Sequence, residues 1–179
     1  MRIISGSHKG KRLFAPKKLP VRPTTDRSKE ALFNILQHQY DWSSIRVLDL
    51  FAGTGNISYE FASRGVNEVF SVDKNSRCIK FIKQTAEKLD LRINTIRIDA
   101  LEYLLSSISM DFDIIFADPP YNLDQQSYFK IVNIIFENNR LSKNGLLILE
   151  HCEKKFLGLH PKFRQSRKYG SNIFSFFEK

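Results

Sequence analysis

The sequence predicts an α/β fold, a doubly wound and mostly parallel sheet of seven strands with helices on both faces. Short apolar runs alternate with amphipathic segments from residue 45 to residue 150, which is typical of β–α–β units with parallel strands. The first apolar run ends in a Gly53-Thr54-Gly55 turn, where the backbone can approach a ligand closely. Residues 163–177 break the alternation and have the pattern of a closing hairpin, which adds antiparallel pairing at one edge.

The first forty residues are expected to form a short basic extension. Residues 2–15 have the pattern of a small hairpin, and the prolines at positions 16, 20 and 23 favour an extended stretch after it. Thr25 or Asp26 is placed to cap a helix that runs to about Gln39. The predicted core face of this helix is Leu32, Ile35 and Leu36. We expect residues 1–40 to pack on a core of residues 41–179, within a single domain.

From residue 45 onward, each predicted strand is followed by a predicted helix. The strands are expected at residues 45–50, 69–72, 93–98, 112–117 and 145–150. The helices are expected at residues 57–64, 76–90, 100–107 and 125–138. The helix at 76–90 has Ile79, Ile82, Ala86 and Leu89 on one face. The final pair of strands is expected to join near Gly170.

The charge of the chain is concentrated at its two ends. Residues 1–30 carry a net charge of +7, residues 31–150 carry −3, and residues 151–179 carry +5. A solvated basic surface would account for a uniform excess of positive charge. Segregation to the termini instead favours a polyanionic partner such as a nucleic acid.

Composition also argues against several classes of protein. At 179 residues and 42% hydrophobic content, the chain suits one globular domain and has no apolar run of membrane-spanning length. An apolar leader segment is missing from the N-terminus, so we expect no signal peptide and a cytoplasmic location. Cys78 and Cys152 are isolated and are expected to be reduced thiols. The four histidines are scattered, and we expect no metal site.

Acidic residues stand at the ends of three successive predicted strands. Asp49 lies inside the end of the first, Asp73 follows the second, and Asp99 follows the third. Each alone is more often a helix cap, but together they line the edge where open α/β sheets bind ligands. A dinucleotide fingerprint would need glycine at Ser58, and a phosphate-binding loop would need lysine at Asn56. The pattern therefore predicts a nucleoside pocket of another kind.

The tetrapeptide Asp118-Pro119-Pro120-Tyr121 follows the predicted strand at 112–117. Asp118 can accept a hydrogen bond from an amino group, and Pro119 offers a carbonyl without a competing N–H. Tyr121 can stack on a ring. A turn with a purely structural role would explain the tetrapeptide alone. Combined with the acidic edge, it predicts a clamp for a flat amine.

These motifs, in this order, resemble those of class I S-adenosylmethionine-dependent methyltransferases that act on an exocyclic amine. The segments 2–13 and 22–27, and Arg167 to Gly170 near the end, narrow the resemblance to the RsmD family. Those bacterial enzymes methylate N2 of a guanine in small-subunit (16S) ribosomal RNA. The resemblance covers nearly the whole chain. It departs at Ser5, where a second glycine is expected, and this affects the geometry of the hairpin rather than the chemistry.

The resemblance implies a Rossmann-like fold with S-adenosylmethionine as cofactor. It implies that Asp49, Gly53 and Gly55 shape the pocket for the methionine part of the cofactor, and that Asp73 binds the ribose hydroxyls. It places Asp99, with Ala100 beside it, at the adenine amino group; Phe51 and Lys74 are secondary candidates. The implied catalytic residues are Asp118, Pro119 and Tyr121. For contacts with RNA we expect Arg2, Lys9, Lys11, Arg12, Arg22 and Arg27.

Alternatives remain open at this point. The amine motif alone also fits adenine-N6 or cytosine-N4 methyltransferases, and it resembles the clamp of protein-glutamine methyltransferases, which typically carry asparagine at the position of Asp118. A non-catalytic RNA-binding assembly factor is a second possibility, while a nicotinamide oxidoreductase fails at Ser58. The chain has no room for a sequence-reading module, which favours a structured RNA or a small-subunit assembly particle as partner. We expect a monomer.

Overall fold

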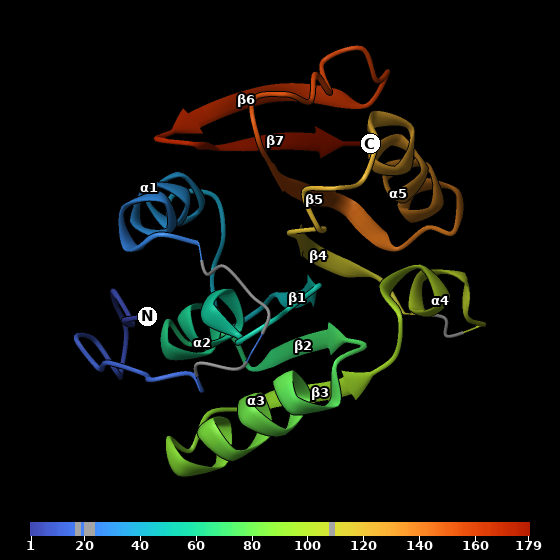
Figure 1. Cartoon of the computed structure of the whole chain (residues 1–179). Coiled ribbons are helices and arrows are strands. Elements are labelled where there is room, and N and C mark those ends of the chain that lie inside the picture. Colours follow the sequence, from blue (N-terminus) through green and yellow to red (C-terminus); the bar gives the residue numbers. More distant parts are fainter. Residues whose placement is uncertain (17–18, 20–23, 108–109) are drawn as a thin grey trace.

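In a computed structural model of the chain, the described residues are 1–16, 19, 24–107 and 110–179. They form one seven-stranded sheet with the order β3-β2-β1-β4-β5-β7-β6 (Figure 1). The strands are β1 (Arg46–Leu50), β2 (Glu68–Asp73), β3 (Ile93–Arg97), β4 (Phe112–Ala117), β5 (Leu141–His151), β6 (Phe163–Tyr169) and β7 (Asn172–Glu178). The helices are α1 (Asp26–Leu36), α2 (Asn56–Ser63), α3 (Ser76–Lys88), α4 (Ala100–Leu105) and α5 (Gln125–Glu137). The predicted fold class is confirmed.

The pairing of the strands creates the site at which a ligand can bind. β1 pairs in parallel with β2 on one side and with β4 on the other. The order in which strands are added to the sheet therefore reverses between β1 and β4. The connections that leave the carboxyl ends of β1 and β4 run to opposite sides, and a crevice opens between them. β7 runs antiparallel to both β5 and β6. The terminal hairpin of β6 and β7 thus forms one edge of the sheet, as predicted, with β6 outermost.

Helices cover both faces of the sheet (Figure 1). Ile114 and Phe116 of β4 pack with α1 and α2, while Ile115 and Ala117 pack with α4 and α5. Side chains alternate along a strand, and all four of these are buried. Burial on both faces explains why the strands are continuous apolar runs in the sequence. In the described part of the chain, no helix is both long enough and apolar enough to cross a membrane.

Two element boundaries differ by three residues or more from those predicted, and the others lie within two residues. α1 ends at Leu36 rather than near Gln39, because the chain tightens into a turn in which the Gln39 N–H donates to the Leu36 carbonyl at 2.9 Å. Its buried face includes Phe33, which the periodicity did not select, while Ile35 is only partly buried. β5 begins at Leu141, four residues early, and its pairing with β4 shifts register near Phe112.

The predicted N-terminal hairpin is present, held by backbone hydrogen bonds from Ile3 to Lys11 at 3.0 Å and from Leu13 to Met1 at 3.0 Å, but it forms no regular strands. Residues 1–16, the N-terminal arm, double back with a single β-bridge between Arg2 and Arg12. The N–H groups of Ile4 and Ser5 donate to the Glu60 carboxylate at 2.8 and 3.0 Å instead of to the opposite side of a hairpin. Because these two donors bond to Glu60 of α2, the arm packs against the helix and its own antiparallel pairing stays short.

Gly6 marks the closest approach of the arm to α2. Its φ is +84°, and a Cβ built there would lie 1.8 Å from the carbonyl oxygen of Ser63, the last residue of α2. The N–H of Ser7 donates to that same carbonyl at 2.7 Å, which satisfies one of the unpaired groups at the helix end. Glycine is therefore required at position 6 for both backbone conformation and space. Gly10 has φ +83° with nothing within 4 Å of its Cβ position.

This contrast predicts different costs for two matched substitutions. Gly10→Ala should lower the free energy of unfolding by about 1–2 kcal/mol, since alanine is strained at positive φ. Gly6→Ala carries the same strain and also forces the arm off α2, so its loss should be larger by a further 1–3 kcal/mol or so. Urea denaturation of both variants measures the difference. Equal losses would contradict the close packing of the arm on α2.

Candidate active site

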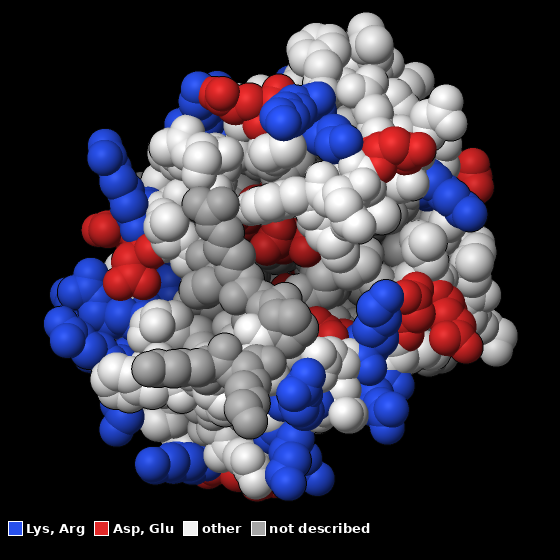
Figure 2. Space-filling model, in the orientation of Figure 1, with Lys and Arg blue, Asp and Glu red and all other residues white. Residues whose placement is uncertain are grey.

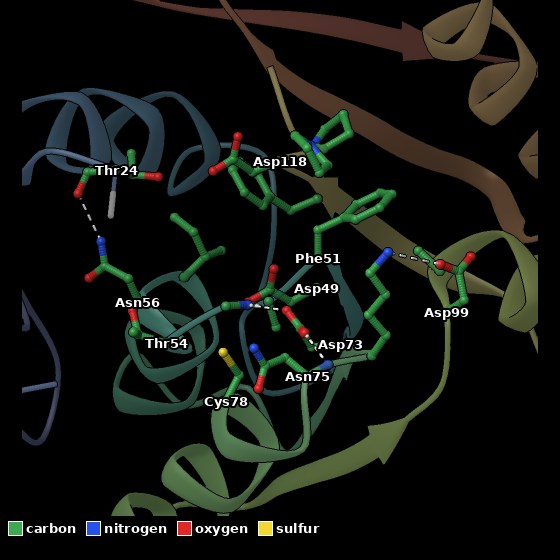
Figure 3. A pocket seen from close by; sticks show the side chains of 18 of the residues that line it. Thr24, Asp49, Phe51, Thr54, Asn56, Asp73, Asn75, Cys78, Asp99 and Asp118 are labelled. Carbon is green, nitrogen blue, oxygen red and sulfur yellow. Dashed lines mark hydrogen bonds and ion pairs between the residues drawn. The ribbon is translucent and has the colours of Figure 1, made fainter. Parts of the chain in front are cut away.

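A cavity of about 340 Å³ opens at the carboxyl edge of the sheet, at the crevice between β1 and β4 (Figure 3). Ten of the predicted site residues line it: Asp49, Phe51, Gly53, Asp73, Lys74, Asp99, Ala100, Asp118, Pro119 and Tyr121. The other lining residues are Thr24, Ala52, Thr54, Asn56, Ile57, Asn75, Cys78, Phe116 and Pro120. Figure 2 shows this opening as a hollow with acidic side chains at its base. The structure thus brings the two sequence motifs together around one space.

The turn after β1 holds an unusual backbone. Phe51 has φ +61°, which is rare for a bulky residue, and Gly53 and Gly55 have φ values of +54° and +78°. Left-handed backbone at a non-glycine residue costs roughly 1–3 kcal/mol and is found where function requires it. Gly55 does not line the cavity. A Cβ there would lie 2.9 Å from Ile82 Cγ1, so this glycine allows the turn to pack on α3.

Asp73 connects the glycine turn to the start of α3. Its Oδ2 accepts from the Gly53 N–H at 2.8 Å, and its Oδ1 accepts from the Asn75 N–H at 2.7 Å (Figure 3). Each carboxylate oxygen keeps further acceptor capacity for a ligand. The side chain is partly buried in the wall of the cavity. Asp73 is therefore suited to accept hydrogen bonds from a pair of hydroxyl groups.

Asp99 has two roles visible in its contacts. It caps α4 by accepting from the Leu101 N–H at 3.0 Å, and it faces Lys74 Nζ at 3.8 Å. The Lys74 side chain is 77% exposed, so this ion pair contributes little to stability. Both residues line the cavity. Helix capping and ligand contact are compatible here, because a capping carboxylate uses only part of its acceptor capacity.

Asp49 is buried at the base of the cavity. Its Oδ2 accepts from the Ser58 N–H at 3.1 Å and from the Ser58 hydroxyl at 2.5 Å, which fixes the first turn of α2. Burial raises the pKa of Asp49 to about 7, and the hydrogen bonds from Ser58 act in the opposite direction. The negative charges of Asp73 and Glu150 raise it further.

Asp118 lies directly after β4, on the other side of the cavity from Asp73 in the view of Figure 3. Burial raises the pKa of the Asp118 carboxyl well above its usual range, and the negative charges of Glu150 and Asp49 add to this effect. Pro119 is buried and Tyr121 is partly buried, and both line the cavity. The clamp motif thus stands in an acidic and poorly solvated environment.

A buried ion pair that the sequence did not predict lies behind the cavity. Lys29 Nζ is 3.3 Å from Glu60 Oε2, and both side chains are fully buried. The same ammonium donates to the Arg2 carbonyl at 2.6 Å and to Asn56 Oδ1 at 2.8 Å. Burial lowers the pKa of Lys29, while Glu60 opposes this shift. The sequence did contain a sign that Lys29 is buried. It lies three residues before Leu32, on the apolar face of α1.

A chain of hydrogen bonds continues from this pair along the cavity wall. Asn56 Nδ2 donates to the Thr24 carbonyl at 2.9 Å (Figure 3), and the Thr24 hydroxyl donates to Glu150 Oε2 at 2.7 Å. Asn172 Nδ2 donates to Glu150 Oε1 at 2.5 Å. Glu150 follows an apolar strand as the predicted acids do, so the same rule would have found it.

The predicted RNA-contacting residues are mostly exposed. Arg2, Lys9, Lys11 and Arg12 lie on the N-terminal arm and Arg27 on α1, while Arg22 lies outside the described residues. Figure 2 shows Lys and Arg gathered on the left, the side on which Figure 1 places the arm. Arg2 Nε also pairs with Asp26 at 3.3 Å. Within the described ranges, no group of three or more His, Cys, Asp or Glu residues could hold a metal ion.

Strand order and the position of the cavity define the class of this protein. The solved structure of the Thermus thermophilus 16S rRNA N2 G1207 methyltransferase in complex with AdoMet and guanosine has the same fold. Its TM-score is 0.69 at 23% sequence identity, and the match covers 90% of this chain and 45% of that chain. The chain therefore has a methyltransferase fold, with its cavity at the crevice between β1 and β4.

Sequence similarity then gives the family. The family described as Conserved hypothetical protein 95 matches residues 1–178. Ribosomal RNA small subunit methyltransferase D of Buchnera aphidicola is 33% identical over 161 residues, which are 89% of this chain and 82% of the relative. A solved hypothetical protein of T. thermophilus matches with a TM-score of 0.86 at 26% identity, covering 100% of this chain and 99% of that chain. The chain belongs to the Conserved hypothetical protein 95 family, and the predicted RsmD resemblance is confirmed.

The raised pKa of Asp49 predicts how stability depends on pH. Between about pH 4 and pH 7 an unfolded Asp49 is ionised while the folded one still holds its proton, so the folded state weakens as pH rises. Relative to Asp49→Asn, wild type should lose on the order of 3–4 kcal/mol of unfolding free energy across this window. Urea denaturation at several pH values measures this. The exposed control Glu87→Gln should follow wild type, and parallel curves for wild type and Asp49→Asn would contradict the assignment.

Proposed function

We propose that this protein transfers a methyl group from S-adenosylmethionine to the exocyclic N2 of a guanine in small-subunit ribosomal RNA. One observation carries the proposal: a single cavity is lined both by the acids at the carboxyl ends of β1, β2 and β3 and by the Asp118-to-Tyr121 motif. The first set suits a nucleoside-containing cofactor and the second suits a flat amine. A common cavity supports the proposal, because the methyl donor and the acceptor amine could meet in it.

The acids of the cavity fit the cofactor by their chemistry. Asp73 can accept from the ribose hydroxyls while it holds the glycine turn, and Asp99 can accept from the adenine amino group beside Ala100. Asp49 and Gly53 shape the end of the cavity for the methionine part. When bound, S-adenosylmethionine supplies a methyl group on a positively charged sulfur, which needs no covalent activation by the protein.

The acceptor amine needs more help from the protein. Its nitrogen shares a lone pair with the aromatic ring and is a weak nucleophile. The Asp118 carboxylate and the Pro119 carbonyl can hold its two N–H bonds out of the ring plane, so that the lone pair points toward the methyl group. This is positioning combined with electrostatic stabilisation of the positive charge that develops on nitrogen. Tyr121 can stack on the base and return roughly 1–3 kcal/mol of the cost of unstacking it.

Asp118 must be ionised for this role, yet its surroundings favour the protonated form. A positive charge in the cavity would offset the negative charges of Glu150 and Asp49 and would lower the pKa of Asp118. We therefore propose that binding of the cationic cofactor helps to ionise the clamp. The neutral product cofactor lacks this effect, so the amine is held most strongly when the methyl donor is present.

RNA is favoured as substrate by two features: several relatives are named as ribosomal RNA methyltransferases, and the basic side chains of the arm are exposed. Guanine N2 is favoured over adenine N6 and cytosine N4 by the resemblance to the RsmD family. An aspartate at position 118 distinguishes the motif from that of protein-glutamine methyltransferases. A bacterial ribosomal substrate also implies a cytoplasmic location.

Two substitutions should separate catalysis from cofactor binding. Asp118→Ala should reduce methyl transfer at least about a hundredfold while leaving the affinity for S-adenosylmethionine within a few-fold of wild type, because the carboxylate acts on the acceptor. Asp73→Ala should chiefly weaken cofactor binding. Labelled methyl transfer to small-subunit RNA, with nucleoside analysis, measures the first effect, and calorimetry measures the second.

The outcomes of this experiment are distinct. N2-methylguanosine as product supports the proposal, whereas methyladenine, methylcytosine or labelled protein would overturn the substrate and retain the clamp. Loss of both activity and cofactor binding in Asp118→Ala would show that its role is misassigned. Cofactor binding by wild type without transfer to any RNA or particle would favour a binding-only assembly factor.

A second prediction concerns the arm. Replacing Lys9, Lys11 and Arg12 with glutamine should weaken RNA binding and reduce the slope of log K against log salt by roughly 0.7–0.9 for each phosphate that is no longer neutralised. Truncation of the arm is unsuitable, because Ile3 and Leu13 are buried and Glu60 would lose its backbone donors. The control replaces the exposed Lys130, Lys143 and Lys179, which removes the same charge elsewhere. An unchanged slope in the arm variant alone would exclude the arm as a phosphate-contacting surface.

A further inference from the structure

Phe14 is the most exposed large apolar side chain in the described part of the chain, at 84% relative exposure. Its outward direction is fixed by its neighbour. Leu13 is buried against Ile3 and Tyr59, and its backbone is held by hydrogen bonds in both directions with Met1, at 3.0 and 3.2 Å. Side chains alternate along an extended backbone, so burial of Leu13 turns Phe14 toward solvent. The ring is therefore presented by a well-held segment.

Charged residues surround this ring. Phe14 lines a shallow hollow together with Arg2, Arg12, Thr24 and Asp26. Both arginines are exposed, and the pairing of Arg2 with Asp26 at 3.3 Å leaves the Arg2 side chain 48% exposed. One exposed aromatic ring with guanidinium groups beside it is poor apolar surface for a protein partner, because such interfaces bury a contiguous apolar centre. It suits a nucleotide, which offers a ring to stack and a phosphate to pair.

The hollow adjoins the cofactor cavity. Thr24 lines both spaces. Met1 also lines the hollow, and its sulfur accepts from the hydroxyl of Thr54, a lining residue of the cavity, at 3.7 Å. The hollow is therefore adjacent to the cavity that contains Asp118, where a nucleotide next to a bound base could reach it. Lys29 holds the Arg2 carbonyl from behind at 2.6 Å, so little ordering is required on binding.

We propose that the hollow binds an unpaired nucleotide next to the target base, with Phe14 stacked on its base and Arg2 and Arg12 at its phosphates. This inference rests on the proposed function, since it takes RNA as the substrate. A flipped target base loses stacking with its neighbours in the RNA. Phe14 replaces that stacking for the neighbour, and Tyr121 replaces it for the target. The two rings would hold consecutive bases apart.

The test uses the full-length protein and three variants. Phe14→Ala should weaken binding of an unpaired RNA oligonucleotide with a central guanine by roughly 5- to 150-fold, the range for loss of one base stack. Phe14→Tyr should bind within about twofold of wild type, because it keeps a ring. The control Leu105→Ala removes an exposed apolar side chain from α4, outside the arm, and should bind as wild type does. Affinity for S-adenosylmethionine should be unchanged in all three.

A second arm of the experiment locates the stacked base. Oligonucleotides with an abasic site directly before or after the guanine remove the proposed partner of Phe14. For one of these two positions, the losses from the abasic site and from Phe14→Ala should not add, because they remove the same interaction. Additive losses at both positions would overturn the proposal.

Two further outcomes separate this inference from the proposed function. Wild-type affinity of Phe14→Ala for RNA would overturn the stacking site and leave the methyltransferase proposal intact. Weaker binding of Phe14→Ala to assembled particles, with unchanged binding to naked RNA, would assign Phe14 to a protein contact and would also overturn it. If wild type itself binds and methylates no RNA, the proposed function fails first.

Discussion

The buried pair of Lys29 and Glu60 is the interaction on which the rest of the N-terminal structure depends. A buried ion pair by itself adds little stability, because desolvation of two charges cancels much of their attraction. Here both ions also satisfy backbone groups: Glu60 accepts from Ile4 and Ser5, and Lys29 donates to the Arg2 carbonyl. Removing either partner would leave a buried charge and several unpaired backbone groups. The pair therefore fixes where the arm lies, which gives it a role in specificity of structure more than in net stability.

This arrangement joins the N-terminal arm to the cavity at the carboxyl edge of the sheet. From Lys29 the hydrogen bonds pass through Asn56 and Thr24 to Glu150, across the carboxyl edge of the sheet. Thr24 is held at both its carbonyl and its hydroxyl, which fixes its place between the cavity and the hollow beside the arm. Under the proposed function, the arm and the amine clamp belong to one rigid frame. RNA bound on the arm is then positioned relative to Asp118 without a moving domain.

Much of this could be predicted from the sequence, because local rules dominate the core. Each strand is an apolar run, and Asp49, Asp73 and Asp99 were identified because acids at the ends of such runs meet at one edge, while Asp118 was identified from its tetrapeptide. The place of the N-terminal hairpin on α2 could not be predicted, because two of its N–H groups bond to Glu60, a contact across more than fifty residues that no local pattern contains. Ser5, the one departure from the family pattern, fits the same explanation. Its N–H serves Glu60 and its φ is not positive, so no glycine is needed there, whereas Gly6 has φ +84° and no room for a side chain.

The crowding of Asp49, Asp118 and Glu150 works against stability, since burial and mutual repulsion raise the pKa values of Asp49 and Asp118. A protein selected for stability alone would replace at least one of them with a neutral residue, as conflicts of this kind concentrate at functional sites. The proposed function supplies the missing charge, because the methyl donor is a cation and its product is not. In the free protein these carboxylates repel one another and lower its stability. In the complex that precedes methyl transfer, they would attract the positive charge of the cofactor. An asparagine at position 118 could grip an amine but could not respond to the charge of the cofactor in this way.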